Sequence, residues 1–145
     1  ARAVDLQEKH RPDLNLLVQY LQPDLVTIML GANDYLHNPA SPAQVKANIQ
    51  SEIANLRQVL DTKQPSIVIG VPYNLAPAAN QYTWAQYADA IKSITIDDPT
   101  IGLLDFSSMG NATPGGQWSS DGLHPSNAGH STMSTITTTY LMSNP

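Results

Sequence analysis

The stretch from Ser120 to Gly129 places the carboxylate of Asp121 three residues before the imidazole of His124, at the start of a predicted helix. A serine hydrolase needs a base that takes the proton of its nucleophile, and an acidic group that holds this base in one tautomer. Asp121 and His124 have the chemistry for these two roles. The same residues also suit an ordinary surface turn, because Asp-Gly is a common turn dipeptide and a His before Pro is found in many loops.

A second polar group follows an apolar run of strand length over residues 24–29. Residues 30–34 then read Leu-Gly-Ala-Asn-Asp. In open α/β sheets, ligands bind beyond the carboxyl ends of the strands, so the amide of Asn33 is placed to donate a hydrogen bond to an oxyanion. Asn33 and Asp34 would equally suit a turn that caps the next segment, because both residue types favour turns.

In this order, the two motifs resemble those of the SGNH hydrolases, also called the GDSL esterase/lipase family. The third block of that family, Gly-x-Asn-Asp, matches residues 31–34, and the fifth, Asp-x-x-His followed by Pro, matches residues 121–125. The interval between the motifs leaves room for two further strand-helix units. The resemblance implies that His124 is the catalytic base, that Asp121 orients it, and that Asn33 belongs to the oxyanion hole.

The nucleophile block of the family, Gly-Asp-Ser, and its second block, with an oxyanion-hole Gly, have no match in the 145 residues. Both blocks precede Gly-x-Asn-Asp in the family, and only 30 residues precede Gly31 here. No Gly-x-Ser-x-Gly elbow is present either. We predict other roles for the serines: Ser41 as a helix cap, Ser66 as a strand start and Ser126 as a turn residue, while Ser119 and Ser120 lie too close to Asp121 in sequence.

We therefore interpret residues 1–145 as a single SGNH hydrolase domain that is incomplete at its N-terminus and inactive alone. The resemblance implies a serine esterase or acyl hydrolase that works through an acyl-enzyme, with no metal and no organic cofactor. Its substrate would be a lipid ester, an acetylated sugar or a small soluble ester. The alternative is a non-catalytic ligand-binding or interaction module on the same fold. An upstream Gly-Asp-Ser would favour the enzyme.

Composition narrows the class of protein. A length of 145 residues with 41% hydrophobic residues is typical of one globular domain. The net charge of −5, without a long run of either sign, predicts no nucleic-acid surface. No apolar stretch approaches the roughly 20 residues of a transmembrane helix. Cysteine is absent, which excludes disulfides and thiolate metal sites, and the charged fraction of 13% favours a secreted protein.

Apolar periodicity predicts helices and strands in alternation. We expect helices over residues 1–22, 41–60 and 80–96 and from residue 127 onward, and strands over residues 24–30, 66–71 and 101–106. Residues 35–39 are expected to be irregular, and residues 107–119 to form a long loop. Such alternation indicates a parallel α/β sheet with right-handed crossovers.

The expected helices have apolar faces, and the strand over residues 24–30 is apolar enough to be covered on both sides. Ser41, Pro42 and Gln44 form the start of a helix with a capping box. Lys46, Glu52 and Arg57 lie off the apolar stripe of that helix. The residues predicted to face inward are Leu14, Leu17, Val18, Leu21, Val45, Ile49, Ile53, Leu56, Leu60, Trp84, Tyr87, Ala88, Ile91, Met133, Ile136 and Tyr140.

Further candidates for the substrate cleft come from the loops. Tyr73 and Asn74 follow the strand over residues 66–71 and must lie at the same sheet edge as Asn33, although an ordinary Pro-rich connector fits this loop equally well. Trp118 is expected beside the turn of Asp121. Gly31 and Asp34, which flank Asn33, complete the candidate set.

The resemblance also implies a flavodoxin-like three-layer α/β/α fold, the SGNH hydrolase fold, whose five-stranded parallel sheet would take its last three strands from this chain. The N-terminal strands are then missing, and one of them would be central. We therefore expect the strand over residues 24–30 to lack a neighbour and to present an apolar edge.

Overall fold

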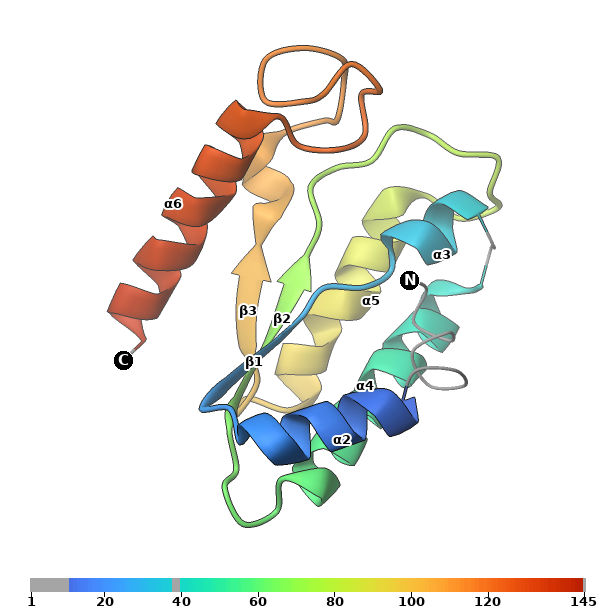
Figure 1. Ribbon diagram of the computed structural model, residues 1–145. Helices are drawn as coiled ribbons and strands as arrows, with labels where there is room; N and C mark the ends of the chain where they lie inside the picture. Colours follow the sequence, from blue (N-terminus) through green and yellow to red (C-terminus); the bar gives the residue numbers. More distant parts are fainter. Residues whose placement is uncertain (1–10, 38–39, 145) are drawn as a thin grey trace.

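The computed structural model describes residues 11–37 and 40–144. Within them, a parallel sheet of three strands, β1 (Leu25–Ile28), β2 (Ser66–Val71) and β3 (Gly102–Asp105), has the order β1-β2-β3 (Figure 1). Every connection between strands passes through helices, so all three strands point the same way. Their carboxyl ends, and the loops that follow them, share one end of the molecule.

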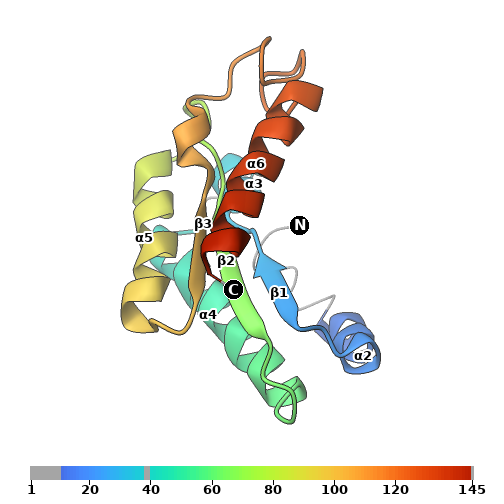
Figure 2. The ribbon, with the colours of Figure 1, turned by 90° about the vertical axis from the view of Figure 1, so that its left-hand side faces the viewer.

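Helices lie on both faces of this sheet. The helical elements are α2 (Arg11–Leu21), α3 (Ala32–His37), α4 (Pro42–Val59), α5 (Trp84–Asp97), the 3-10 helix η2 (Phe106–Met109) and α6 (Asn127–Ser143). On one face α4 and α5 pack against each other, and on the opposite face α6 packs against β3 and η2 (Figure 2). The three layers agree with the α/β/α prediction.

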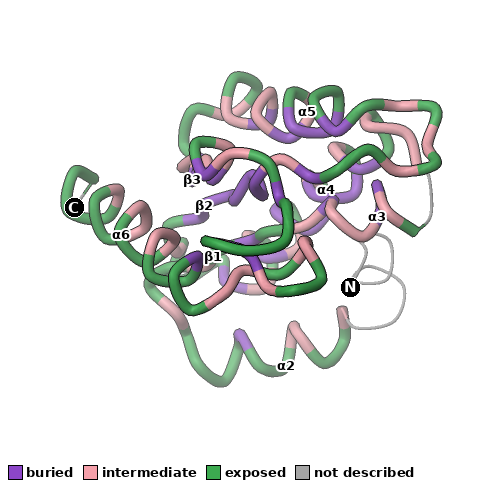
Figure 3. Tube along the Cα trace, turned by 90° about the horizontal axis from the view of Figure 1, so that it is seen from above, coloured by how far each residue is buried: buried purple, intermediate pink, exposed green. Residues whose placement is uncertain are grey.

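The core lies between β2 and the pair α4 and α5. All five residues of the predicted α4 stripe, from Val45 to Leu60, are at most 3% exposed, and β2 is buried at every position after Ser66 (Figure 3). Ser41 caps α4 by accepting a hydrogen bond from the backbone of Gln44. The Gln44 side chain, however, donates to Asn48 at 2.9 Å, so it takes part in a bond along the helix.

Glu52 corrects the prediction that it would lie off the apolar stripe of α4. Its side chain is 1% exposed, and the guanidinium of Arg11 on α2 pairs with Oε2 at 3.1 Å, while Asn55 donates to Oε1 at 3.1 Å. A carboxylate can be buried when such partners replace water. This ion pair links α2 to α4.

Residues 35–37 are helical, which corrects the prediction of an irregular segment. Tyr35 is buried, with its ring centroid 5.5 Å from that of Trp84 and 5.4 Å from that of Tyr87, so packing supports the short helix α3. Residues 38 and 39 lie outside the described residues, as do the first ten residues of the predicted helix 1–22. The helix expected from residue 80 begins only at Trp84, because Thr83 and Gln86 form a capping box there.

The sides of α2 and β1 are less covered than predicted. Leu17 and Leu21 are 52% and 60% exposed, so only Leu14 and Val18 of the predicted face pack inward. In the described part of the chain β1 pairs with β2 alone, and Leu25 is 36% exposed. The prediction that this strand is covered on both faces is wrong, because α6 lies over β3 and leaves Leu25 and Thr27 of β1 exposed (Figure 2).

We expect the 145-residue chain alone to self-associate through β1, because an unpaired apolar edge offers free backbone groups for pairing. Leu25→Lys places a charge on this edge and should shift the chain toward monomer in sedimentation velocity. Ile96→Lys is the matched control, because Ile96 is 80% exposed on α5, beside the opposite edge of the sheet. A chain that is monomeric at every concentration, or an equal effect of both variants, would contradict association through β1.

Candidate active site

The predicted site residues share the carboxyl end of the sheet. Asn33 follows β1, Tyr73 follows β2, and Asp121 and His124 lie in the loop between β3 and α6 (Figure 1). This end is where ligands bind in open parallel sheets. The topology therefore brings together residues that are far apart in the sequence.

The side chains of Asp121 and His124 form a direct hydrogen bond. His124 Nδ1 lies 2.6 Å from Asp121 Oδ2, and the other carboxylate oxygen accepts from the backbone N–H groups of Leu123 at 2.8 Å and His124 at 3.0 Å. A carboxylate only accepts, so the neutral imidazole keeps its proton on Nδ1 and leaves Nε2 as an acceptor. The His124 side chain is 71% exposed, which leaves the ring accessible to a reacting group.

The Asp121 carboxyl of this pair has a lowered pKa. Its hydrogen bond to the His124 ring, followed by those from the backbone of His124 and Leu123, lowers the pKa of Asp121 from 3.8 to about 2. Asp121 is therefore ionised at neutral pH and able to stabilise an imidazolium at position 124.

Backbone hydrogen bonds fix the turn that carries the pair. Ser119 donates to the carbonyl of His124 at 2.8 Å, and Gly122 donates to that of Ser119 at 2.9 Å. Gly122 has φ +65°, and a Cβ there would come within 2.7 Å of Pro114. The Asp-Gly dipeptide thus lies in a turn, as its residue types indicate, and this turn also holds His124 in place.

Asn33 lies in the first turn of α3 and is half-buried. The turn before it requires glycine, because Gly31 has φ +107° and a Cβ would lie 3.0 Å from Ile91. Gly31 and Asp34 are both buried, Asp34 completely. Burial, and to a smaller extent the charge of Asp34, raises the pKa of Tyr87 in the core beside α3.

Trp118 lies beside the turn, as predicted. Its main chain forms an isolated β-bridge with that of Pro125. The residue is 6% exposed, and its ring centroid is 4.2 Å from that of Tyr73. Tyr73 is also buried, and its hydroxyl donates to the carbonyl of Leu123 at 2.5 Å. Asn74 is half-buried, and its carbonyl accepts from the backbone of Ala112 at 2.8 Å. Tyr73 and Trp118 therefore support the turn from inside.

One supporting residue has no signal in the sequence. The Asn80 amide donates to the carbonyl of Tyr35 at 3.0 Å and to the hydroxyl of Tyr87 at 3.1 Å, and its oxygen accepts from the backbone of Tyr82 at 3.0 Å. These bonds join the loop after β2 to α3. An asparagine in an irregular loop is too common for this role to be predicted.

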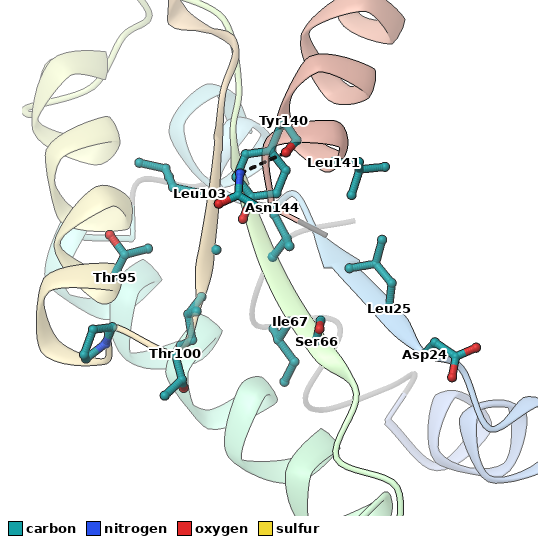
Figure 4. Close-up of a pocket in the computed structure, with 14 residues that line it drawn as sticks. Asp24, Leu25, Ser66, Ile67, Thr95, Thr100, Leu103, Tyr140, Leu141 and Asn144 are labelled. Atoms are coloured by element: carbon teal, nitrogen blue, oxygen red, sulfur yellow. Dashed lines mark hydrogen bonds between the residues drawn. The ribbon is translucent and has the colours of Figure 1, made fainter.

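Among the described residues, no group of three or more His, Asp and Glu side chains could hold a metal ion, and no helix is long and apolar enough to cross a membrane. A hollow of about 820 Å³ is lined at the start of each strand, by Leu25, Ser66 and Gly102, and by Tyr140 of α6 (Figure 4). It lies at the amino ends of the strands, opposite the turn of His124.

Comparisons with known proteins agree with this geometry. The family model of the GDSL-like Lipase/Acylhydrolase family matches residues 2–131. A carbohydrate esterase family 3 structure from Talaromyces cellulolyticus is 15% identical, with a TM-score of 0.76 over 99% of this chain and 67% of that chain. A family 3 carbohydrate esterase from Clostridium thermocellum is 19% identical, with a TM-score of 0.75 over 99% of this chain and 66% of that one.

These similarities confirm the flavodoxin-like α/β fold that the resemblance implied. The chain spans about two thirds of the length of each esterase structure. No curated protein sequence matches the chain.

The low pKa of Asp121 predicts how the turn responds to acid. A carboxyl whose pKa is depressed on folding contributes stability above its ordinary pKa of 3.8, and this contribution is lost as the pH falls through about 2. A ¹³C titration of the Asp121 carboxyl should give a midpoint near pH 2. His124→Ala, which removes the largest contribution, should raise it. A midpoint near 3.8 in the unaltered chain would show that the hydrogen bonds of Asp121 do not persist in solution.

Proposed function

We propose, since the chain belongs to the GDSL-like lipase/acylhydrolase family, that it carries the acid-base half of a serine esterase. The observation that carries this proposal is the 2.6 Å contact between His124 Nδ1 and Asp121 Oδ2 at the carboxyl end of a parallel sheet. The pair has an ionised orienting group, an exposed ring and an Nε2 without a hydrogen-bond partner among the described residues, which are the properties that a general base needs.

In the proposed reaction, a serine hydroxyl attacks the ester carbonyl and gives its proton to Nε2 of His124. The imidazolium is stabilised by Asp121 through Nδ1, and the tetrahedral intermediate carries a negative oxygen. His124 then donates the proton to the leaving alcohol, which leaves an acyl-enzyme. Water then attacks the acyl group with His124 again as base, and His124 gives this proton to the serine oxygen as its bond to the acyl group breaks and the acid leaves.

Asn33 is the proposed side-chain donor to the oxyanion. It is half-buried, follows β1 at the carboxyl end of the sheet, and is held in place by the glycine turn at Gly31. An amide donor directed at the oxyanion contributes on the order of 3 kcal/mol to the stability of the transition state. Backbone N–H groups would supply the other donors.

The nucleophile, we propose, comes from a segment outside these 145 residues, which would complete the single domain. The sequence contains no Gly-Asp-Ser. In the part of the chain that the structure describes, no serine hydroxyl bonds to His124, and that of Ser119 donates to the carbonyl of Pro125. The free edge of β1 would accept the strand that bears the missing motif.

The same comparison supports a proposal for the substrate class. Both similar structures are carbohydrate esterases by name. Of the lipid, acetylated-sugar and small-ester substrates that the family resemblance allows, we therefore propose the acetylated sugar.

The test joins the chain to a segment that bears Gly-Asp-Ser and measures hydrolysis of p-nitrophenyl acetate. His124→Ala should lower kcat by several orders of magnitude, because the triad loses its base. His130→Ala is the matched control, since His130 is exposed on α6, and it should leave kcat unchanged. Near-full activity of the His124 variant, with unchanged circular dichroism, would remove His124 from the mechanism. A joined chain without activity would favour a non-catalytic module.

A further inference from the structure

Tyr73 reaches from the central strand to the turn of the catalytic pair. It lies two residues after the end of β2, and its hydroxyl donates to the carbonyl of Leu123, a residue 50 positions further along the chain. Leu123 immediately precedes His124 in the sequence. The hydroxyl therefore contacts the main chain of the turn at the residue before the base.

The peptide group that Tyr73 contacts also binds the carboxylate. The carbonyl of Leu123 and the N–H of His124 belong to the same peptide, and this N–H donates to Asp121 Oδ1 at 3.0 Å. A hydrogen bond accepted by a carbonyl polarises its peptide and strengthens the N–H as a donor. The Tyr73 hydroxyl, the peptide and the Asp121 carboxylate thus form one chain of hydrogen bonds that fixes the peptide plane.

The Tyr73 ring is itself held rigidly. It is 8% exposed, and its centroid lies 4.2 Å from that of Trp118 with the ring planes at 55°. The main chain of Trp118 forms an isolated β-bridge with that of Pro125, the residue that follows His124. The Tyr73 hydroxyl and the Trp118 main chain therefore contact the turn immediately before and after the histidine.

The hydroxyl stays protonated at neutral pH and so remains a donor. Burial, followed by the negative charge of Asp121, raises the pKa of Tyr73 above its ordinary value of 10.0. No other phenol has a hydrogen bond to this turn in the described part of the chain.

We propose that Tyr73 is a positioning residue for the base, which acts on His124 through the Leu123–His124 peptide and the Asp121 carboxylate. The pair it serves is exposed, with side chains 71% and 48% accessible, so solvent would otherwise leave both free to rotate. The role as part of a catalytic site rests on the proposed function, whereas the positioning of the pair does not require turnover.

The test is Tyr73→Phe in the 145-residue chain, because phenylalanine keeps the ring and removes only the donor. The His124 amide should exchange with solvent deuterium about three to ten times faster, as expected for the loss of one hydrogen bond. The titration midpoint of the Asp121 carboxyl should rise from about 2, and the Nδ1 proton resonance of His124 should broaden. Tyr82→Phe is the matched control, since the Tyr82 ring packs on Tyr87 away from the turn.

Unchanged exchange, midpoint and resonance in a folded Tyr73→Phe chain would overturn the proposal. If this variant fails to fold, meta-fluorotyrosine at position 73 keeps the hydroxyl and makes it a stronger donor. The His124 amide should then exchange more slowly, and equal or faster exchange would overturn the proposal.

In the joined, active polypeptide, Tyr73→Phe should lower kcat with KM unchanged. If no variant of that polypeptide has activity, the proposed function fails, while the exchange data still decide the role of Tyr73.

Discussion

The hydrogen bond between His124 Nδ1 and Asp121 Oδ2 is the interaction on which the proposed chemistry depends, and it joins two exposed side chains. Exposed ion pairs contribute little on their own, because ordering two side chains in water offsets most of their attraction. The order must therefore come from the main chain around them. Backbone bonds from Ser119 and Gly122, and the N–H groups that saturate Asp121 Oδ1, hold the pair in place.

The turn is supported by the buried strand β2, through Tyr73, which follows that strand. This strand is buried at every position after Ser66, between α4 and α5 on one side and the neighbouring strands along its edges. Tyr73 and Trp118 extend the packed interior from the end of β2 to the turn. The other strand edge is different, because β1 has one neighbour in the described residues and exposes Leu25. The sheet is thus closely packed at β2 and partly exposed at β1.

The sequence predicts the local features well, because each is encoded by neighbouring residues. The strand 66–71 has the same bounds in the structure, since it is an apolar run between Pro65 and Pro72. Features that depend on distant partners could not be predicted. The burial of Glu52 requires Arg11, which is 41 residues away, and the support that Tyr73 gives requires Leu123. The short helix α3 likewise depends on aromatic packing with α5.

The central claim is that base and orienting acid lie in this chain while the nucleophile lies outside it. Intact-mass spectrometry after reaction with a fluorophosphonate probe tests this claim directly. The 145-residue chain should remain unlabelled, and the chain joined to a Gly-Asp-Ser segment should carry one label per molecule. That label should disappear when the serine of this motif is changed to alanine. Stoichiometric labelling of the 145-residue chain alone would contradict the claim, because a nucleophile would then lie among its own serines.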